Sequence, residues 1–401
     1  MGAFSSFRDN RSKKNSDTPT VEGHYTRLGR IAAATRYAVL AALVVFAVYS
    51  FLNHRDEITI ENFRYMMKFI NIGEEAEKPV GSVISFDGTV GNRGVIYKGD
   101  LAVINENGVT VTGWDGDVTL KQNFSYDHPK MLQNGTHLFC YDLGGKELKI
   151  FNSYSLLSTA SFDYPIYWMA VSQSGRYIAA SSAKGYRSAV YVYDQEFRTV
   201  YSALFGKKYV DFADISADGR EIILAGHYSD GGDILAFLSR YSTESKEPLC
   251  EISFIGEIPL GIYYTVNGYA LLTSDALRVF NGSDTKIGEI DFSGRKPVSA
   301  AVYGDRILIS YASEGLSGGT ELVLYNEECE RLLTETFANS LTAATVCGDK
   351  VYALSPGVLT ESVPGAGSSV YEIPTSFFAL ITDGDRLILF SDSEARYFEN
   401  N

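Results

Sequence analysis

The side chains that most often perform chemistry are few and scattered in this chain of 401 residues. The histidines include His54, His128, His137 and His227, which lie far apart along the sequence. A zinc or non-haem iron site needs two or three histidines or carboxylates at characteristic spacing, and no such set is visible. We therefore expect surface histidines or hydrogen-bonded core histidines, not metal ligands.

The cysteines are equally dispersed, at Cys140, Cys250, Cys329 and Cys347. None belongs to a Cys-x-x-Cys pair or to a metal-binding spacing. An exported domain can form disulfide bonds. The wide spacing of these cysteines along the sequence instead favours buried free thiols in strands.

Carboxylates are abundant but form no recognisable site. Asp115-Gly-Asp117 and Asp383-Gly-Asp385 supply too few oxygen ligands for a calcium loop and are typical of hairpin turns. A glycosidase needs two converging carboxylates, and the 46 acidic residues beyond residue 52 provide no basis for choosing a pair. No nucleophile elbow between a strand and a helix is apparent, and Walker and dinucleotide motifs are absent. The sequence therefore assigns no catalytic residue, no metal ligand and no cofactor.

Charge is distributed unevenly along the chain. Residues 1–52 carry a net charge of about +4, and the remainder carries −18. An acidic domain repels the phosphate backbone, so nucleic acid is excluded as an expected partner.

An apolar segment, IAAATRYAVLAALVVFAVYSFL at 31–52, follows the basic N-terminus. Twenty-two helical residues reach roughly 33 Å, enough for a bilayer core, so we predict a transmembrane helix that contacts the lipid bilayer. Residues 1–30 are then a basic, disordered cytoplasmic tail, and the positive-inside rule places residues 53–401 outside the cytoplasm. A cleaved signal peptide and a buried core helix are the alternatives.

Residues 53–81 form a predicted neck. The apolar spacing in EITIENFRYMMKFIN at 57–71 indicates a short helix, packed under the next domain or serving as a dimerisation or membrane-surface helix. GEEAEKPVG at 73–81 is a polar linker.

From residue 82 onward, short apolar runs alternate with Gly, Asp, Asn and Ser turns, which is the pattern of an antiparallel β protein. The runs recur as a unit of about 35 to 50 residues with four strands each, the period of a β-propeller. The tight turn after the first strand of each unit contains Gly99-Asp100, Asn134-Gly135, Ser174-Gly175-Arg176, Asp218-Gly219-Arg220, Asn267-Gly268, Gly304-Asp305-Arg306, Gly348-Asp349-Lys350 and Gly384-Asp385-Arg386.

These units begin near residues 94, 129, 167, 210, 259, 297, 341 and 377. The last unit has only three strands before the chain stops. SVISFD at 82–87 precedes the first unit and supplies the missing strand, which would remove an exposed edge. We predict an all-β propeller over 82–401 with eight four-stranded blades, and seven blades as the alternative.

The basic tail, the span, the neck ITIENFRYMMKFINI, the strand SVISFDG and the blades together resemble an uncharacterised family of Firmicutes proteins. That family, labelled only as a domain of unknown function, combines one membrane span with an extracytoplasmic propeller. The resemblance covers nearly the whole chain and implies no activity and no site residues. In general form the blades also resemble quinoprotein-like, WD40-like and outer-membrane-assembly propellers. They are not a standard WD40 array, because Trp114-Asp115 is the only Trp-Asp dipeptide.

Two segments, ASEGLSGGTE at 312–321 and PGVLTESVPGAGSS at 356–369, are rich in small residues and are the predicted flexible binding loops. The leading hypothesis is a binding or scaffold module at the cell envelope, with a protein or glycan as its partner. The alternative is an extracellular enzyme, polymer-active or quinoprotein-like, that uses the propeller channel.

Overall fold

The computed structural model describes residues 21–53, 83–87, 91–312 and 318–399. The chain divides into two units, residues 1–63 and 64–401, which are described separately. The predicted neck helix at 57–71, the linker at 73–81 and His54 lie outside the described residues.

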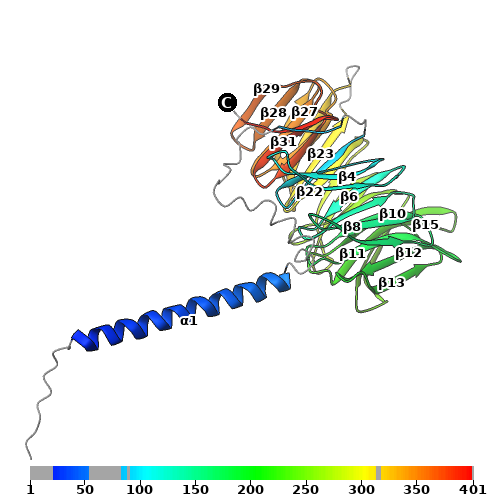
Figure 1. Cartoon of the computed structure of the whole chain (residues 1–401). Coiled ribbons are helices and arrows are strands. Elements are labelled where there is room, and N and C mark those ends of the chain that lie inside the picture. The colour runs from blue at the N-terminus through cyan, green and yellow to red at the C-terminus, as the bar shows by residue number, and fades with distance from the viewer. Residues whose placement is uncertain (1–20, 54–82, 88–90, 313–317, 400–401) are drawn as a thin grey trace, which may run out of the picture. The chain divides into compact units, whose positions relative to one another are not determined.

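The first unit contains one described helix, α1 (Val21–Asn53) (Figure 1). It contains no proline, and it begins at Val21, ten residues before the apolar segment. It therefore includes residues 21–30 of the predicted disordered tail. Within the described residues, no helix has both the length and the apolar character that crossing a membrane requires. The predicted segment 31–52 lies within α1, whose N-terminal half carries Arg30 and Arg36.

The second unit is a β-propeller whose described strands form eight four-stranded antiparallel sheets. Blades 1 and 2 consist of β2 (Arg93–Tyr97), β3 (Asp100–Asn105), β4 (Gly108–Thr112), β5 (Val118–Asn123), β6 (Pro129–Gln133), β7 (Leu138–Asp142), β8 (Glu147–Phe151) and β9 (Leu156–Ser161). Blades 3 and 4 consist of β10 (Ile166–Val171), β11 (Tyr177–Ala183), β12 (Tyr186–Tyr193), β13 (Thr199–Phe205), β14 (Tyr209–Ile215), β15 (Glu221–Asp230), β16 (Asp233–Ser242) and β17 (Pro248–Ile255).

The second half of the ring repeats the same order. Blades 5 and 6 consist of β18 (Pro259–Tyr264), β19 (Gly268–Thr273), β20 (Ala276–Asn281), β21 (Lys286–Asp291), β22 (Pro297–Tyr303), β23 (Arg306–Ala312), β24 (Thr320–Asn326) and β25 (Arg331–Phe337). Blades 7 and 8 consist of β26 (Ala343–Cys347), β27 (Lys350–Ser355), β28 (Val358–Val363), β29 (Gly367–Glu372), β30 (Ala379–Asp383), β31 (Arg386–Phe390), β32 (Glu394–Tyr397) and β1 (Val83–Ser85). The prediction of eight four-stranded blades is confirmed.

The hairpin turns explain why the repeat is visible in the sequence. The glycine between the first two strands has a positive φ in seven blades, a conformation that side chains disfavour. Gly268 is the exception: it does not have a positive φ, and glycine is needed there because a side chain would not fit. A Cβ added there would lie 1.9 Å from the Phe280 carbonyl oxygen on the adjacent strand.

The eighth blade is closed by β1, which lies within the predicted segment 82–87. β1 pairs antiparallel with β32, so that Ile84 stands opposite Ala395. Ile84 is 3% exposed and packs with Leu101 of blade 1 and Ile388 of blade 8. The closing strand therefore joins both ends of the propeller into one core.

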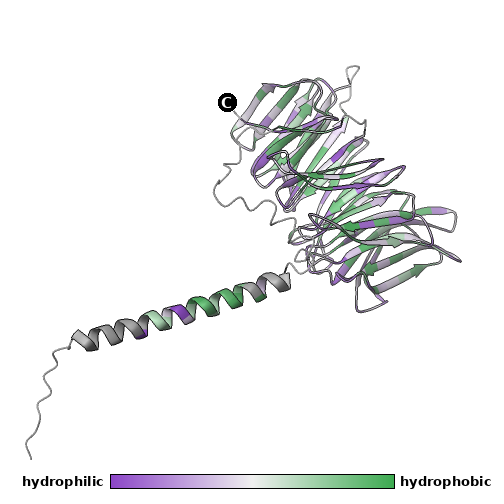
Figure 2. Ribbon diagram, viewed as in Figure 1, coloured by the Kyte–Doolittle hydropathy of each residue, from purple (hydrophilic) through white to green (hydrophobic). Residues whose placement is uncertain are grey.

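The described core is divided into eight clusters of buried apolar side chains, and one lies at each interface between neighbouring blades. The second strand of each blade is buried on both faces, which is why runs such as Leu101–Ile104 and Leu387–Phe390 are continuously apolar. Figure 2 shows apolar residues following the strands of the blades. Every blade is thus held by two neighbours.

Candidate functional site

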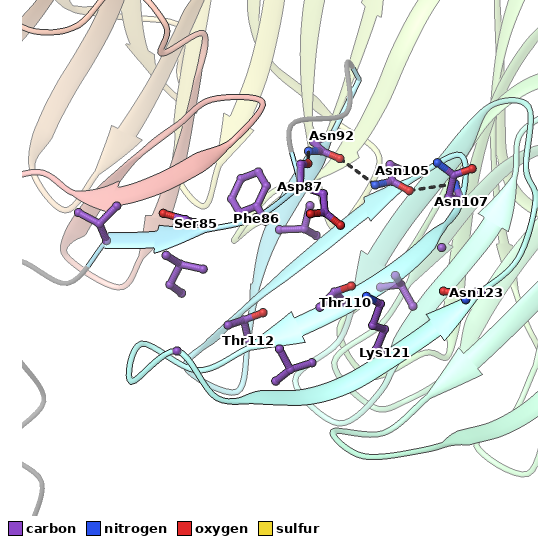
Figure 3. A pocket seen from close by; sticks show the side chains of 17 residues that line it. Ser85, Phe86, Asp87, Asn92, Asn105, Asn107, Thr110, Thr112, Lys121 and Asn123 are labelled. Carbon is purple, nitrogen blue, oxygen red and sulfur yellow. Dashed lines mark hydrogen bonds between the residues drawn. The ribbon is translucent and has the colours of Figure 1, made fainter.

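A groove of about 440 Å³ lies between β1 and the blade 1 strands β3 to β5 (Figure 3). It exists because the closing strand is short. β1 has three residues, whereas the outermost strands of the other seven blades have six to eight. The outer part of blade 1 is consequently left uncovered on the side that faces blade 8.

One wall of the groove is a chain of asparagine amides. Asn92 is 2% exposed, and its Nδ2 donates to the backbone oxygens of Asp87 at 3.0 Å and of Asp392 at 2.6 Å. Its Oδ1 accepts from Asn105 Nδ2 at 3.0 Å. The Asn105 Oδ1 in turn accepts from the backbone N–H of Asn107 at 2.9 Å. This wall is therefore rigid, and the same contacts tie both chain ends of the propeller together.

The other wall comes from β4 and β5. Thr110 and Thr112 contribute hydroxyls, and Lys121 and Asn123 contribute an ammonium and an amide (Figure 3). Gly108 permits β4 to approach β5 closely, because an added Cβ would lie 2.2 Å from the Gln122 carbonyl oxygen.

The donor set of the groove suits hydrogen bonding more than proton transfer. Among the described lining residues, Asp87 and Lys121 are the charged ones, and the rest of the polar surface is amide and hydroxyl. Neutral donors and acceptors at fixed positions recognise a polar ligand, whereas general acid–base catalysis needs a positioned titratable pair. The lining therefore suits the binding of a polar ligand.

The histidines are separate from one another in the structure. His137 is 3% exposed, with Nδ1 3.1 Å from Thr136 Oγ1, and His128 lies at the surface. His227 Nδ1 lies 2.7 Å from Asp211 Oδ2. The described residues contain no group of three or more His, Cys, Asp or Glu side chains that could hold a metal.

The Asp-Gly-Asp segments are hairpin turns, as predicted. The Asp115 carboxylate accepts from the Asp117 backbone N–H at 3.0 Å, and Gly116 has φ 88°. Asp383 accepts from the Tyr397 hydroxyl at 2.7 Å, and Gly384 has φ 61°. The Asp115 carboxylate therefore bonds within its own turn, and the Asp383 carboxylate bonds to the strand β32 of blade 8.

All four cysteines are free thiols. Cys140, Cys250 and Cys347 lie in strands, and burial raises the pKa of each. Cys329 differs from the prediction because it lies in the turn between β24 and β25, at φ 64°.

The prediction of a flexible binding loop at 356–369 is wrong. This segment forms most of β28 and β29 with a short turn between them, because Val358, Leu359 and Thr360 supply a strand core inside the glycine-rich composition. The other predicted loop, 312–321, does connect β23 to β24, and residues 313–317 lie outside the described part. Its described ends, Ala312 and Gly318 to Thr320, line a smaller cavity of about 260 Å³ between blades 6 and 7.

Residue types and spacing did not identify the groove. Its walls come from both ends of the propeller and depend on a strand three residues long. The available signals were the asparagines at 92, 105, 107 and 123 and the brevity of SVISFD, which is a run of apolar residues too short to complete a blade edge.

A comparison with family models matches residues 79–358 to a family of unknown function, DUF5711. The chain belongs to this family. The matched region begins just before β1 and ends at the start of β28, so the family model includes the residues that line the groove, blades 1 to 6, most of the first three strands of blade 7 and the strand β1 of blade 8. No curated protein matches the chain.

Solved structures show the same fold at low sequence identity. The C-terminal WD40 domain of Sif2 is 12% identical with a TM-score of 0.55, and the match covers 80% of this chain and 100% of that domain. A chain of the mitotic checkpoint complex is 13% identical with a TM-score of 0.48, and the match covers 83% of this chain and 98% of that one. The first comparison establishes a WD40-like propeller fold and nothing about its ligand.

Proposed function

We propose that this member of the DUF5711 family is a binding or scaffold module of the cell envelope, and that its propeller engages an envelope protein or glycan through the groove between β1 and blade 1. The observation that carries the proposal is the groove itself. The buried Asn92 fixes Asn105 and the backbone at Asp87 and Asp392, so a ligand would meet a wall of the groove that is already positioned. Such preorganisation lowers the ordering cost of binding.

The proposal includes a membrane anchor at residues 31–52, a cytoplasmic N-terminus and an extracytoplasmic propeller. Support comes from the basic flank of the segment and from the apolar side chains of α1, among which Leu43, Val45 and Phe46 are each more than 60% exposed. Side chains of this kind are stable in contact with lipid. The Firmicutes origin that the sequence resemblance implies belongs to the same proposal.

The anchor is tested by fractionating cells that express the full chain with an epitope tag after residue 401. We expect the tag in the membrane fraction, resistant to alkaline carbonate, and accessible to protease added to intact cells from which the outer wall has been removed. A variant lacking residues 31–52 should be released. Recovery of the intact chain in the carbonate-soluble fraction would contradict the anchor.

The binding proposal is tested by crosslinking in intact cells followed by affinity capture through the same tag. Thr112→Trp fills the groove, and Lys121→Glu reverses its cation. We expect both variants to lose the partner that the wild-type chain captures, whereas Lys246→Glu, in the turn between β16 and β17, retains it. Equal capture of the partner by the wild type and all three variants would show that the groove is not the binding site.

The enzyme alternative has less support from the described side chains. A quinone cofactor in the channel would use a tryptophan that is free to stack on it, and the chain has two tryptophans. Trp114 is 8% exposed and packs on Tyr397, and Trp168 Nε1 donates to the Ala213 carbonyl oxygen at 2.8 Å. Both rings are engaged in packing between blades.

A further inference from the structure

The innermost strands of the ring differ in one respect that divides the propeller into two halves. In blades 3 to 6 the first strand contains a register shift at its N-terminal end, between Ile166 and Trp168, Val210 and Phe212, Pro259 and Gly261, and Pro297 and Ser299. The first strands of blades 1, 2, 7 and 8 pair without a shift. Four consecutive blades thus share a bulge at the same level of the channel.

A β-bulge turns a side chain away from the regular pleat, and bulges are frequent beside functional sites. The residues skipped by the four shifts are Tyr167, Asp211, Leu260 and Val298. Their exposed fractions are 40%, 33%, 43% and 66%. Innermost strands line the central channel of a propeller and run in the same direction, so these side chains lie along one half of one mouth of the channel.

Cationic and aromatic groups gather on the blade 3 and blade 4 part of this rim. The rings of Tyr209 and His227 stack with centroids 5.1 Å apart at an interplanar angle of 11°. Arg187 places its guanidinium carbon 5.3 Å from the centre of the Tyr209 ring. The His227 ring nitrogen Nδ1 also contacts Asp211 Oδ2, so the Asp211 carboxylate already has a partner. Among the described residues, no salt bridge to the exposed Arg187 is found, although the region beyond residue 52 has a net charge of −18.

Branched aliphatic groups continue the rim over blades 5 and 6. Leu260 and Val298 are exposed from two successive bulges, and Ile258, in the link just before β18, is 55% exposed. Exposed apolar side chains on neighbouring blades of one rim indicate an interaction surface.

We propose that this rim, the crescent formed by Tyr167, Arg187, Tyr209, His227, Leu260 and Val298, binds an acidic polypeptide segment that also carries aliphatic side chains. The segment's carboxylates would pair with Arg187 beside the Tyr209 ring, and its aliphatic side chains would pack on Leu260 and Val298. Tyrosine and arginine dominate the energetics of protein interfaces, and branched aliphatic groups match aliphatic side chains better than sugar hydroxyls. The crescent is separate from the groove between blade 8 and blade 1.

The test uses the purified full chain in detergent and fluorescence anisotropy with three labelled peptides of equal length, composed of Glu and Leu, of Lys and Leu, and of Glu and Ser. We expect the Glu and Leu peptide to bind most tightly, and added salt to weaken it. Arg187→Glu and Val298→Asp should each weaken this binding by about tenfold or more, which corresponds to about 1.4 kcal/mol. Both side chains are exposed, so both variants should fold.

The matched control is Lys246→Glu, which reverses an exposed cation at the opposite ends of the strands and should leave the affinity unchanged. Tighter binding of the Lys and Leu peptide, or equal binding by Arg187→Glu and wild type, would overturn the proposal. Binding of inorganic polyphosphate that Arg187→Glu abolishes and Val298→Asp leaves intact would assign the crescent to an anionic polymer instead. Because the assay needs neither cells nor the groove, its failure leaves the proposed envelope function standing.

Discussion

At the scale of single residues, the propeller contains partly buried polar groups that connect blades and that respond to pH. Asp214 on β14 accepts hydrogen bonds from the backbone N–H of Tyr264 in blade 5 at 2.8 Å and of Ile215 at 2.9 Å. Burial raises the Asp214 pKa from 3.8 to about 6, although these two bonds oppose the change. Since the folded-state pKa is above the unfolded value, the stabilising contribution is complete below pH 3.8 and is lost as the pH rises through about 6.

Asp214→Asn should therefore flatten the pH dependence of stability between about pH 4 and pH 6. The wild-type free energy of unfolding should fall across this window by up to about 3 kcal/mol from this one group, since one pKa unit corresponds to about 1.4 kcal/mol. Urea unfolding at a series of pH values measures it. Asp218→Asn is a control of opposite sign, because hydrogen bonds from Ser216 and the Arg220 backbone lower the Asp218 pKa. An unchanged slope in Asp214→Asn would contradict the assignment.

Asn92 is the second residue for which a single side chain has a large expected effect. Asn92→Ala leaves the carbonyl oxygens of Asp87 and Asp392 and the Asn105 amide without their partner. We expect a loss of about 2 to 3 kcal/mol in the free energy of unfolding, because unsatisfied buried polar groups retain their desolvation cost. Asn107→Ala removes an exposed amide of the same groove and should change stability by less than about 0.5 kcal/mol. Equal denaturation midpoints for the two variants would show that Asn92 does not hold the closure.

At the scale of elements, the alternating burial of residues in the closing strand β1 should have a large effect on the stability of the propeller. Ile84 is 3% exposed and Val83 is 42% exposed, because neighbouring residues of a strand face opposite sides. Ile84→Asp should lower the free energy of unfolding by at least about 3 kcal/mol, since it buries an unpaired carboxylate between blades 8 and 1. Val83→Asp in the same three-residue strand should cost about 1 kcal/mol or less. Chemical denaturation of both variants distinguishes a structural closing strand from a loosely attached segment, for which the two costs would be alike.

The elements also show which parts of the fold the sequence predicts and which it does not. The turns at Gly99, Gly219 and Gly384 require a positive φ, so composition alone marks where the first strand of each blade ends. The strands at 358–372 were not predicted, because Pro356, Gly357 and Gly367 lie at their ends and obscure the apolar positions between them.

The groove and the crescent were beyond prediction for a different reason. The first depends on how far β1 extends along β32, and the second depends on four register shifts. Both are properties of how strands pair. The alternation of apolar and polar side chains along one strand does not show how far the pairing extends or where a bulge interrupts it.

At the scale of the whole molecule, the decisive feature is that the ring has no free end. Each interface between blades has its own apolar cluster, and β1 joins the last blade to the first. In an open repeat array stability is a sum over neighbours, and the ends unfold first. In this closed ring, opening any one interface exposes apolar surface on two blades, so we expect unfolding to be one cooperative transition.

The two tryptophans make this expectation measurable, because they stand at different interfaces. Trp114 packs on Tyr397 between blades 8 and 1, and Trp168 packs edge-on against Phe212 between blades 3 and 4. Trp114→Phe and Trp168→Phe each leave a single fluorescent reporter. Urea midpoints and slopes from the two reporters should coincide for an intact ring. Adding Ile84→Asp to each variant should shift both midpoints downward together, although Trp168 lies several blades from the closing strand. If the Trp114 midpoint fell while the Trp168 midpoint stayed in place, the blades would unfold as independent repeats, and the closing strand would stabilise only its own neighbours.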